Sequence, residues 1–212
     1  MRAVLCSRNA HKARELEQLL PGWTIEPLLA DDYPEETGLT YSENALLKAG
    51  FGQRRVGGWT IGEDSGIEVV ALGGRPGLHS ARYAREAASA VGQAADTRPE
   101  DRAAFGDPGG APAIARLLAE LAGVTDRRAR YVSELVAIAP DAEVLRGTGI
   151  LAGTIADAPR GSGGFGYDPV FIPDGEHLTV AQLGDSWKNE HSHRARSARA
   201  LREAFECRLG AP

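Results

Sequence analysis

The hydrophobic pattern of the chain changes repeatedly between short apolar runs and a helical period. Residues 2–6 form a short apolar run, which is typical of a buried strand. Between residues 11 and 20, the apolar residues Ala13, Leu16, Leu19 and Leu20 fall on one face of a helix. The same criteria predict further strands at residues 23–28, 59–62, 67–72, 130–139, 143–155 and 169–172, and further helices at residues 42–55, 113–122 and 192–209. This alternation predicts an α/β fold.

Polar or glycine-rich segments separate these elements. Residues 31–38 are acidic and rich in turn formers, and residues 63–66 (EDSG) are expected to form a corner between two strands. Residues 84–112 show little periodicity and are expected to form a surface insertion with one weak helix. Residues 161–173 form a glycine-rich loop. Because neither a repeat nor a linker divides the pattern, we expect a single domain over residues 1–212.

The composition is that of a globular protein. Of the 212 residues, 42% are hydrophobic and 25% are charged, and the formal net charge is −5. A negative charge disfavours general binding to nucleic-acid backbones, and no apolar run reaches the ~18–20 residues of a membrane helix. The first residues lack the apolar length of a signal peptide, and Cys6 and Cys207 are too few for a disulfide framework. We therefore expect a cytoplasmic protein with reduced thiols and with no nucleic-acid or membrane partner.

Lysine is rare in this chain. Of its 24 basic residues, only Lys12, Lys48 and Lys188 are lysines, and arginine is used everywhere else. An ammonium is compact and flexible, whereas a guanidinium is planar, so the three lysines are candidates for sites that require the smaller group. Chance is the alternative explanation in so small a sample.

The segment Ser7–Lys12 lies between a predicted strand and a predicted helix. The first amides of a helix have no partner within it and, with the helix dipole, attract anions. Ser7 and Asn9 add polar side chains, and Lys12 follows one turn later, so a phosphate is the natural ligand. Alternatively, Ser7 or Asn9 only caps the helix. No Walker-type phosphate loop occurs in the chain.

Acidic residues gather at several predicted loop positions. Mg²⁺ prefers oxygen ligands, often one or two carboxylates together with substrate phosphates and water. Glu35-Glu36 and Glu63-Asp64 could supply such carboxylates, and one of them could also deprotonate an attacking water. Glu43 suits the first turn of a helix without any further role, and a solvated turn is the alternative for Glu63-Asp64.

The glycine-rich segment 161–169 satisfies G-x-G-x-x-G by its letters alone. A dinucleotide-binding fingerprint must open a helix, which Asp168-Pro169 prevents, so we reject that interpretation. The segment places Phe165, Tyr167 and Asp168 on a flexible loop, where an aromatic ring could stack on a base. A surface loop with one aromatic in the core is the alternative.

A cationic group precedes the last predicted helix. Lys188, His193 and Arg194 lie within seven residues and suit phosphates or purine carbonyl oxygens. A solvated basic helix face is the alternative. No His or Cys spacing fits zinc, and Cys6 lies in an apolar run that is typical of a buried structural thiol.

These fragments together resemble the inosine triphosphate pyrophosphatase family, whose members are also called XTP/dITP diphosphatases. The resemblance extends from Ala3 to about Leu209, and all three lysines lie within its motifs. The motifs are 7–12 (SRNAHK), 36–48 (ETGLTYSENALLK), 63–67 (EDSGI), 72–83 (LGGRPGLHSARY), 163–169 (GGFGYDP), Lys188 and 192–194 (SHR).

The resemblance implies an elongated mixed β-sheet with flanking helices, in two lobes with a central substrate cleft. It implies a homodimer that hydrolyses non-standard purine nucleoside triphosphates to the monophosphate and pyrophosphate with Mg²⁺. It implies metal ligation by Glu36 and Asp64, with Asp64 also the catalytic base. Substrate binding falls to Ser7, Arg8, Asn9, Ala10, His11, Lys12, Lys48, Ser65, Phe165, Gly166, Tyr167, Asp168, Lys188, His193 and Arg194. Arg194 and amides near Asp168 are expected to donate to the 6-oxygen of the purine and so disfavour ATP.

The chain departs from the family pattern in several places. Arg8 stands where the family has glycine, residues 84–112 are longer than expected, and residues 185–187 (DSW) replace an acidic segment. Because Glu35 and Glu36 are adjacent, either could be the second metal ligand. Two other functions remain open: a pyrophosphatase for modified pyrimidine nucleotides, and a nucleotide sensor that does not hydrolyse its ligand.

Overall fold

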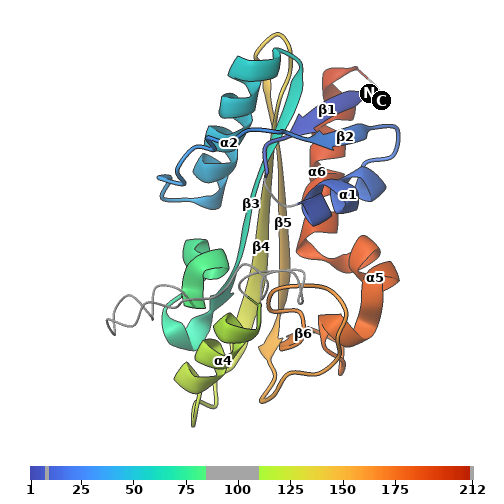
Figure 1. The fold of residues 1–212 in the computed structure, drawn as a ribbon. Coiled ribbons are helices and arrows are strands. Elements are labelled where there is room, and N and C mark those ends of the chain that lie inside the picture. The colour runs from blue at the N-terminus through green and yellow to red at the C-terminus, as the bar shows by residue number, and fades with distance from the viewer. Residues whose placement is uncertain (8–9, 85–109, 211–212) are drawn as a thin grey trace. The chain divides into compact units, whose positions relative to one another are not determined.

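The computed structural model describes residues 1–7, 10–84 and 110–210 and contains both strands and helices (Figure 1). The strands are β1 (Arg2–Leu5), β2 (Thr24–Pro27), β3 (Trp59–Val69), β4 (Arg128–Ile138), β5 (Val144–Ile155) and β6 (Phe171–Pro173). The helices are α1 (Ala10–Leu19), α2 (Tyr41–Val56), α4 (Gly110–Glu120), α5 (Val180–His191) and α6 (His193–Arg208), with 3₁₀ turns η1 (Val70–Leu72) and η2 (Gly77–Arg82). The α/β class predicted from the sequence is confirmed.

The strands form one six-stranded sheet in the order β2-β1-β3-β4-β5-β6. Strand β1 is parallel to both of its neighbours, with Ala3 opposite Ile25 of β2 and Trp59 of β3. Strand β6 is antiparallel to β5, with Ile172 opposite Thr154. The sheet is therefore mixed, as expected.

The described chain divides into two compact units. The first comprises Met1–Ser65, Val132–Ile150 and Asn189–Pro212, and the second comprises Gly66–Tyr131 and Leu151–Lys188. Each unit has its own hydrophobic core, around Leu5, Leu16, Ile61, Leu135 and Leu201 in the first and around Ile67, Leu117, Tyr131, Tyr167 and Phe171 in the second. That the whole chain is one domain, and that a cleft divides it, remain predictions.

Helices of the first unit approach its strands closely at glycines. A Cβ atom at Gly62 of β3 would lie 1.9 Å from the carbonyl oxygen of Ala45 in α2. A Cβ atom at Gly149 of β5 would lie 1.9 Å from the carbonyl oxygen of His193 in α6. In Figure 1, α2 lies on one side of these strands and α1 and α6 lie on the other. Both faces of β3 in this unit are therefore covered, which decides where the functional side chains meet.

The expected corner at residues 63–66 is wrong. Strand β3 continues through these residues without a break, and residues 70–72 form the turn η1. Glu63 and Asp64 can be buried within the strand because each carboxylate contacts a cationic side chain. The pattern of polar residues along the sequence does not reveal these contacts.

Two further segments differ from the sequence-based expectation. Residues 110–112 of the expected insertion already belong to α4, and residues 85–109 lie outside the described chain. Helix α5 escaped prediction because Gly184, with φ 82°, interrupts its helical geometry and its apolar period. Among the described residues, no helix is long and apolar enough to cross a membrane.

Candidate active site

Strand β3 carries two adjacent carboxylates to opposite faces of the sheet. Side chains alternate along a strand, so Glu63 reaches α1 and α6 whereas Asp64 reaches α2. The first unit therefore contains two charged centres, one around Glu63 and one around the adjacent residue Asp64. Both centres include a lysine from the set of three that the sequence singled out.

The Glu63 centre is a buried ion-pair network. Glu63 Oε2 lies 2.5 Å from Lys12 Nζ, and Glu63 Oε1 lies 3.0 Å from Arg194 Nη2. Burial by itself would raise the pKa of the Glu63 carboxyl, but Lys12 and Arg194 outweigh burial and hold that pKa well below its usual range. Glu63 is therefore ionised at neutral pH and compensates two cations.

Arg194 has partners that the sequence did not suggest. It is 1% exposed, its Nη1 lies 2.5 Å from Glu15 Oε2, and its Nε donates to Glu63. Burial lowers the pKa of the Arg194 guanidinium, but Glu63 and Glu15 more than offset this and raise it. Glu15 was missed, although its place three residues after Lys12 on one helix could have indicated it. The geometry gives Arg194 a role in holding α1 and β3 together, and its expected contact with a purine stays a prediction.

The Asp64 centre joins α2 to β3. Lys48 Nζ lies 3.0 Å from Asp64 Oδ1 and donates to the carbonyl of Glu63, while Asn44 Nδ2 donates to Asp64 Oδ2 at 3.1 Å. Burial raises the pKa of Asp64, Lys48 lowers it and Glu36 raises it, and the net shift is upward. Burial lowers the pKa of Lys48, but Asp64 and Glu36 outweigh burial and raise it. A carboxylate with a raised pKa is a stronger base, which suits proton abstraction from water.

Glu36 converges on the same lysine. Its Oε1 lies 2.6 Å from Lys48 Nζ, so Glu36 and Asp64 share one cationic partner. In the described part of the chain, no three His, Cys, Asp or Glu side chains gather around a common cation position. Two carboxylate oxygens fit a hard cation such as Mg²⁺, since such ions take their remaining ligands from phosphates and water.

The predicted phosphate loop is described only in part. Ser7 follows β1 and accepts a hydrogen bond at its carbonyl from Tyr33 Oη at 3.2 Å, and Lys12 lies in α1. Arg8 and Asn9 lie outside the described residues, as do the side chains of Ala10 and His11. Helix α1 has no acidic residue in its first turn, so its N-terminus keeps its attraction for anions.

In the second unit, the glycine-rich loop wraps around a buried carboxylate. Asp168 Oδ2 accepts from Lys188 Nζ at 2.9 Å and from the Phe165 amide at 3.0 Å, and Oδ1 accepts from Tyr131 Oη at 3.3 Å. Asp168 is 4% exposed and Lys188 is 6% exposed. Lys188 Nζ also lies 4.5 Å from the centroid of the Phe165 ring. Phe165 is half-buried, and these contacts hold it at a defined position, as stacking of a base on its ring would require.

Three other predicted residues are buried or half-buried. Tyr167 belongs to the core of the second unit, and its hydroxyl donates to the Ser80 carbonyl at 3.0 Å. His193 is buried at the start of α6, directly after the capping residue Ser192. Ser65 is half-buried and follows Asp64 on β3.

Replacing Gly164 in the glycine-rich loop by alanine is expected to lower the free energy of unfolding by about 1–3 kcal/mol more than replacing Gly175 by alanine. Both glycines have positive φ values, 73° and 86°, so both replacements carry the same backbone strain. Only at Gly164 would the new Cβ meet a neighbour, Asp168 Oδ2 at 2.1 Å. Chemical denaturation of the two variants measures the difference, and equal losses would show that Asp168 moves aside without cost.

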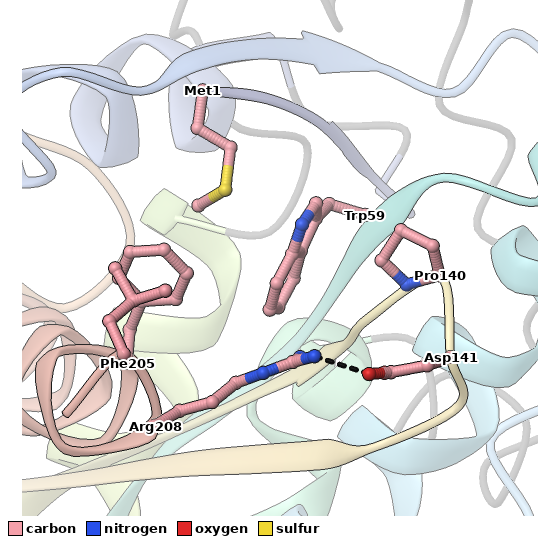
Figure 2. A pocket seen from close by; sticks show the side chains of 7 residues that line it. Met1, Trp59, Pro140, Asp141, Phe205 and Arg208 are labelled. Carbon is pink, nitrogen blue, oxygen red and sulfur yellow. Dashed lines mark hydrogen bonds and ion pairs between the residues drawn. The ribbon is translucent and has the colours of Figure 1, made fainter.

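The cavity shown in Figure 2 lies apart from these centres. It has a volume of about 350 Å³ and is lined by Met1, Trp59, Pro140, Asp141, Phe205, Arg208 and Leu209. Trp59 begins β3, and Asp64 follows five residues later, which corresponds to roughly 16 Å along a strand. The cavity is mainly aromatic and aliphatic, and it contains none of the predicted site residues.

Comparison with known proteins shows which family the chain belongs to. The model of the Ham1 family matches residues 3–204. A Deinococcus deserti protein named dITP/XTP pyrophosphatase is 39% identical over 205 residues, which cover 96% of this chain and 88% of that protein. A Thermus thermophilus protein of the same name is 40% identical over 210 residues, which cover 97% and 92% of the two chains. The solved structure of the Staphylococcus aureus Ham1 protein matches with a TM-score of 0.78 at 33% identity, covering 98% of this chain and 100% of that one. The chain belongs to the Ham1 family.

Proposed function

We propose that this protein is a nucleoside triphosphate pyrophosphatase that hydrolyses the non-standard purine nucleotides ITP, dITP and XTP to the monophosphate and pyrophosphate. The observation that carries the proposal is the convergence of Asp64 and Glu36 on Lys48. The relatives from Deinococcus deserti and Thermus thermophilus are named dITP/XTP pyrophosphatase. An oxygen-rich site beside a lysine suits a triphosphate and the water that attacks it.

Asp64 is the proposed catalytic base. It takes a proton from a water molecule, whose oxygen forms a bond to the α-phosphorus while the bond to the pyrophosphate oxygen breaks. Lys48 and Asn44 hold the two Asp64 oxygens in place through the contacts described above. Burial raises the basicity of the Asp64 carboxylate, so that it accepts a proton more readily than an exposed aspartate does.

Mg²⁺ is the proposed cofactor, with Glu36 and Asp64 as its protein ligands. When bound, it supplies positive charge that offsets the charge of the phosphates. Lys48 contacts both carboxylates and keeps them close together at one place. Their separation would otherwise grow, because two like charges repel.

The remaining site residues are assigned by their chemistry. For the phosphate end of the substrate we propose Ser7, Arg8, Asn9, Ala10, His11, Lys12 and Lys48, with Ser65 as a further contact. For the purine and sugar we propose Phe165, Gly166, Tyr167, Asp168, Lys188, His193 and Arg194. A half-buried ring such as Phe165 can stack on any base, so selection against ATP needs donors directed at the 6-oxygen. A homodimer in the cytoplasm completes the proposal, and sedimentation analysis would give the oligomeric state.

A pyrophosphate-release assay across nucleotides tests the function. ITP, dITP and XTP should be hydrolysed with much higher kcat/KM than ATP, and only when Mg²⁺ is present. Preference for modified UTP would instead indicate a pyrimidine pyrophosphatase. Binding of ITP without pyrophosphate release would indicate a sensor.

Lys12→Arg is expected to lower kcat/KM on ITP by at least about tenfold. Lys12 Nζ lies 2.5 Å from the buried carboxylate of Glu63, and a wider guanidinium cannot occupy that position without displacing its neighbours. Steady-state kinetics measure the change in kcat/KM. Arg54→Lys is the control, because it also exchanges arginine and lysine but at an exposed position. Parent-like kinetics in Lys12→Arg would show that any cation suffices at this position.

A further inference from the structure

The side-chain amide of Asn44 lies between the acidic loop and the proposed base. Asn44 is the fourth residue of α2 and is 1% exposed. Its Oδ1 accepts from the Gly38 amide at 2.8 Å, and its Nδ2 donates to Asp64 Oδ2 at 3.1 Å. One side chain therefore contacts both the loop that carries Glu36 and the carboxylate of Asp64.

The orientation of this amide is determined by its partners. The Gly38 N–H group can only donate, so it must face the amide oxygen of Asn44, and the NH₂ group must then face Asp64. The loop approaches so closely that a Cβ atom at Gly38 would lie 2.7 Å from Asn44 Oδ1. Only a glycine leaves this hydrogen bond its normal length.

The start of α2 does not depend on Asn44. Thr40 Oγ1 accepts from the Glu43 amide at 3.1 Å, and Glu43 Oε2 accepts from the Leu39 amide at 2.7 Å. Thr40 thus caps the helix, and Glu43 holds the residue before the cap. These contacts set the start of the helix without the side-chain amide of Asn44.

We infer that Asn44 is a positioning residue for hydrolysis: its amide holds Asp64 Oδ2 and ties that orientation to the loop that carries Glu36. With Oδ2 held by Asn44, Oδ1 faces Lys48 at 3.0 Å. Helix α2 then positions both carboxylates of the centre. Asn44 contacts Asp64 directly, and it holds Glu36 through its contact with Gly38, which lies two residues after Glu36 in the same loop. The inference rests on the proposed function, in which Asp64 is the base.

Two substitutions separate the contacts of Asn44. Asn44→Asp keeps an oxygen for the Gly38 amide but places a carboxylate, which cannot donate, against Asp64. The N-terminus of a helix favours a negative charge, which offsets part of the repulsion from Asp64, and the crystal structure shows whether the variant folds as the parent does. Asn44→Ala removes both contacts. Asn189→Asp is the matched control, because it makes the same chemical change where Asn189 Nδ2 donates to Gln18 at 3.2 Å on an exposed part of the first unit.

Three measurements are made on each variant: kcat and KM on dITP, exchange of the Gly38 amide by NMR, and the crystal structure. For Asn44→Asp we expect kcat to fall by roughly tenfold or more, KM to stay within about twofold, and Gly38 exchange to match the parent. Its structure should show Asp64 turned away from residue 44. For Asn44→Ala we expect a similar loss of kcat together with Gly38 exchange at least about tenfold faster. Asn189→Asp should change nothing.

Several results would overturn the inference. These are a parent-like kcat in Asn44→Asp, a loss confined to KM, an unchanged Asp64 side chain in its structure, or equal Gly38 exchange in Asn44→Ala and the parent. If the parent itself released no pyrophosphate from any nucleotide, the proposed function would fail. The exchange rates and the Asp64 conformation would still decide whether Asn44 links the two carboxylates.

Discussion

Asp64→Asn is expected to lower kcat on ITP by about 10²–10⁴-fold. Asparagine keeps the size of the side chain and loses the negative charge and the basicity on which proton abstraction depends. The fold should survive, because Lys48 retains Glu36 as an anionic partner at 2.6 Å. The loss of activity is therefore expected without a matching loss of stability.

Pyrophosphate release and thermal unfolding, measured on the same preparation, check this prediction. Asp174→Asn provides the control, since Asp174 is exposed and lies directly after β6. Turnover in Asp64→Asn close to that of the parent would remove Asp64 from the mechanism. A variant that is unfolded, or that unfolds at a much lower temperature than the parent, would show instead that the Asp64 carboxylate is needed for folding.

Glu63→Gln is expected to lower the free energy of unfolding at pH 7 by about 3–5 kcal/mol. The carboxylate of Glu63 is fully buried and compensates both Lys12 and Arg194. A neutral glutamine would leave these cations without that compensation, and its NH₂ group would face at least one of them. Removing one member of a buried ion pair is costly because the remaining charge cannot be solvated.

The difference between parent and variant should depend on pH in a defined direction. The pKa of Glu63 is held below the ordinary value of 4.5, so its stabilisation is fully present above about pH 4.5. That stabilisation is lost as the pH falls from 4.5 through the lower pKa of the folded state. Urea unfolding of the parent and of Glu63→Gln between pH 7 and pH 3 measures their free energies of unfolding. The difference between the two should decrease only below about pH 4.5.

Glu68→Gln is the matched control for this prediction. It makes the same chemical change on the same strand, but Glu68 pairs at 2.7 Å with the half-exposed Arg130. A pair of this kind contributes about 0–1 kcal/mol. Equal destabilisation by the two substitutions would mean that burial does not strengthen the Glu63 network.

Local periodicity was sufficient for most of the fold. The helical repeat of Ala13, Leu16 and Leu19 corresponds to α1, and the short apolar run before it corresponds to β1. Each of these elements buries one continuous apolar set, and that information lies within a few residues. The prediction broke down at β3, where a charged segment continues as a strand, and at α5, where Gly184 interrupts the pattern.

The site residues were predicted less completely than the elements. Scarcity of lysine pointed to Lys12, Lys48 and Lys188, and each of them contacts a predicted or newly found carboxylate. Asn44 and Glu15 were not among the predicted site residues, because an asparagine or a glutamate inside a helix resembles ordinary surface. Their importance depends on partners that no local pattern contains.

By itself the sequence determined the class of fold, most element positions and the motifs shared with the Ham1 family. Only the tertiary structure decided how the charges combine: that Glu63 and Asp64 face opposite sides of one strand, and that Arg194 meets Glu63 from 131 residues away. The reason is physical. Secondary structure follows from neighbours along the chain, whereas the protonation and orientation of a buried charge follow from whichever group folding places against it.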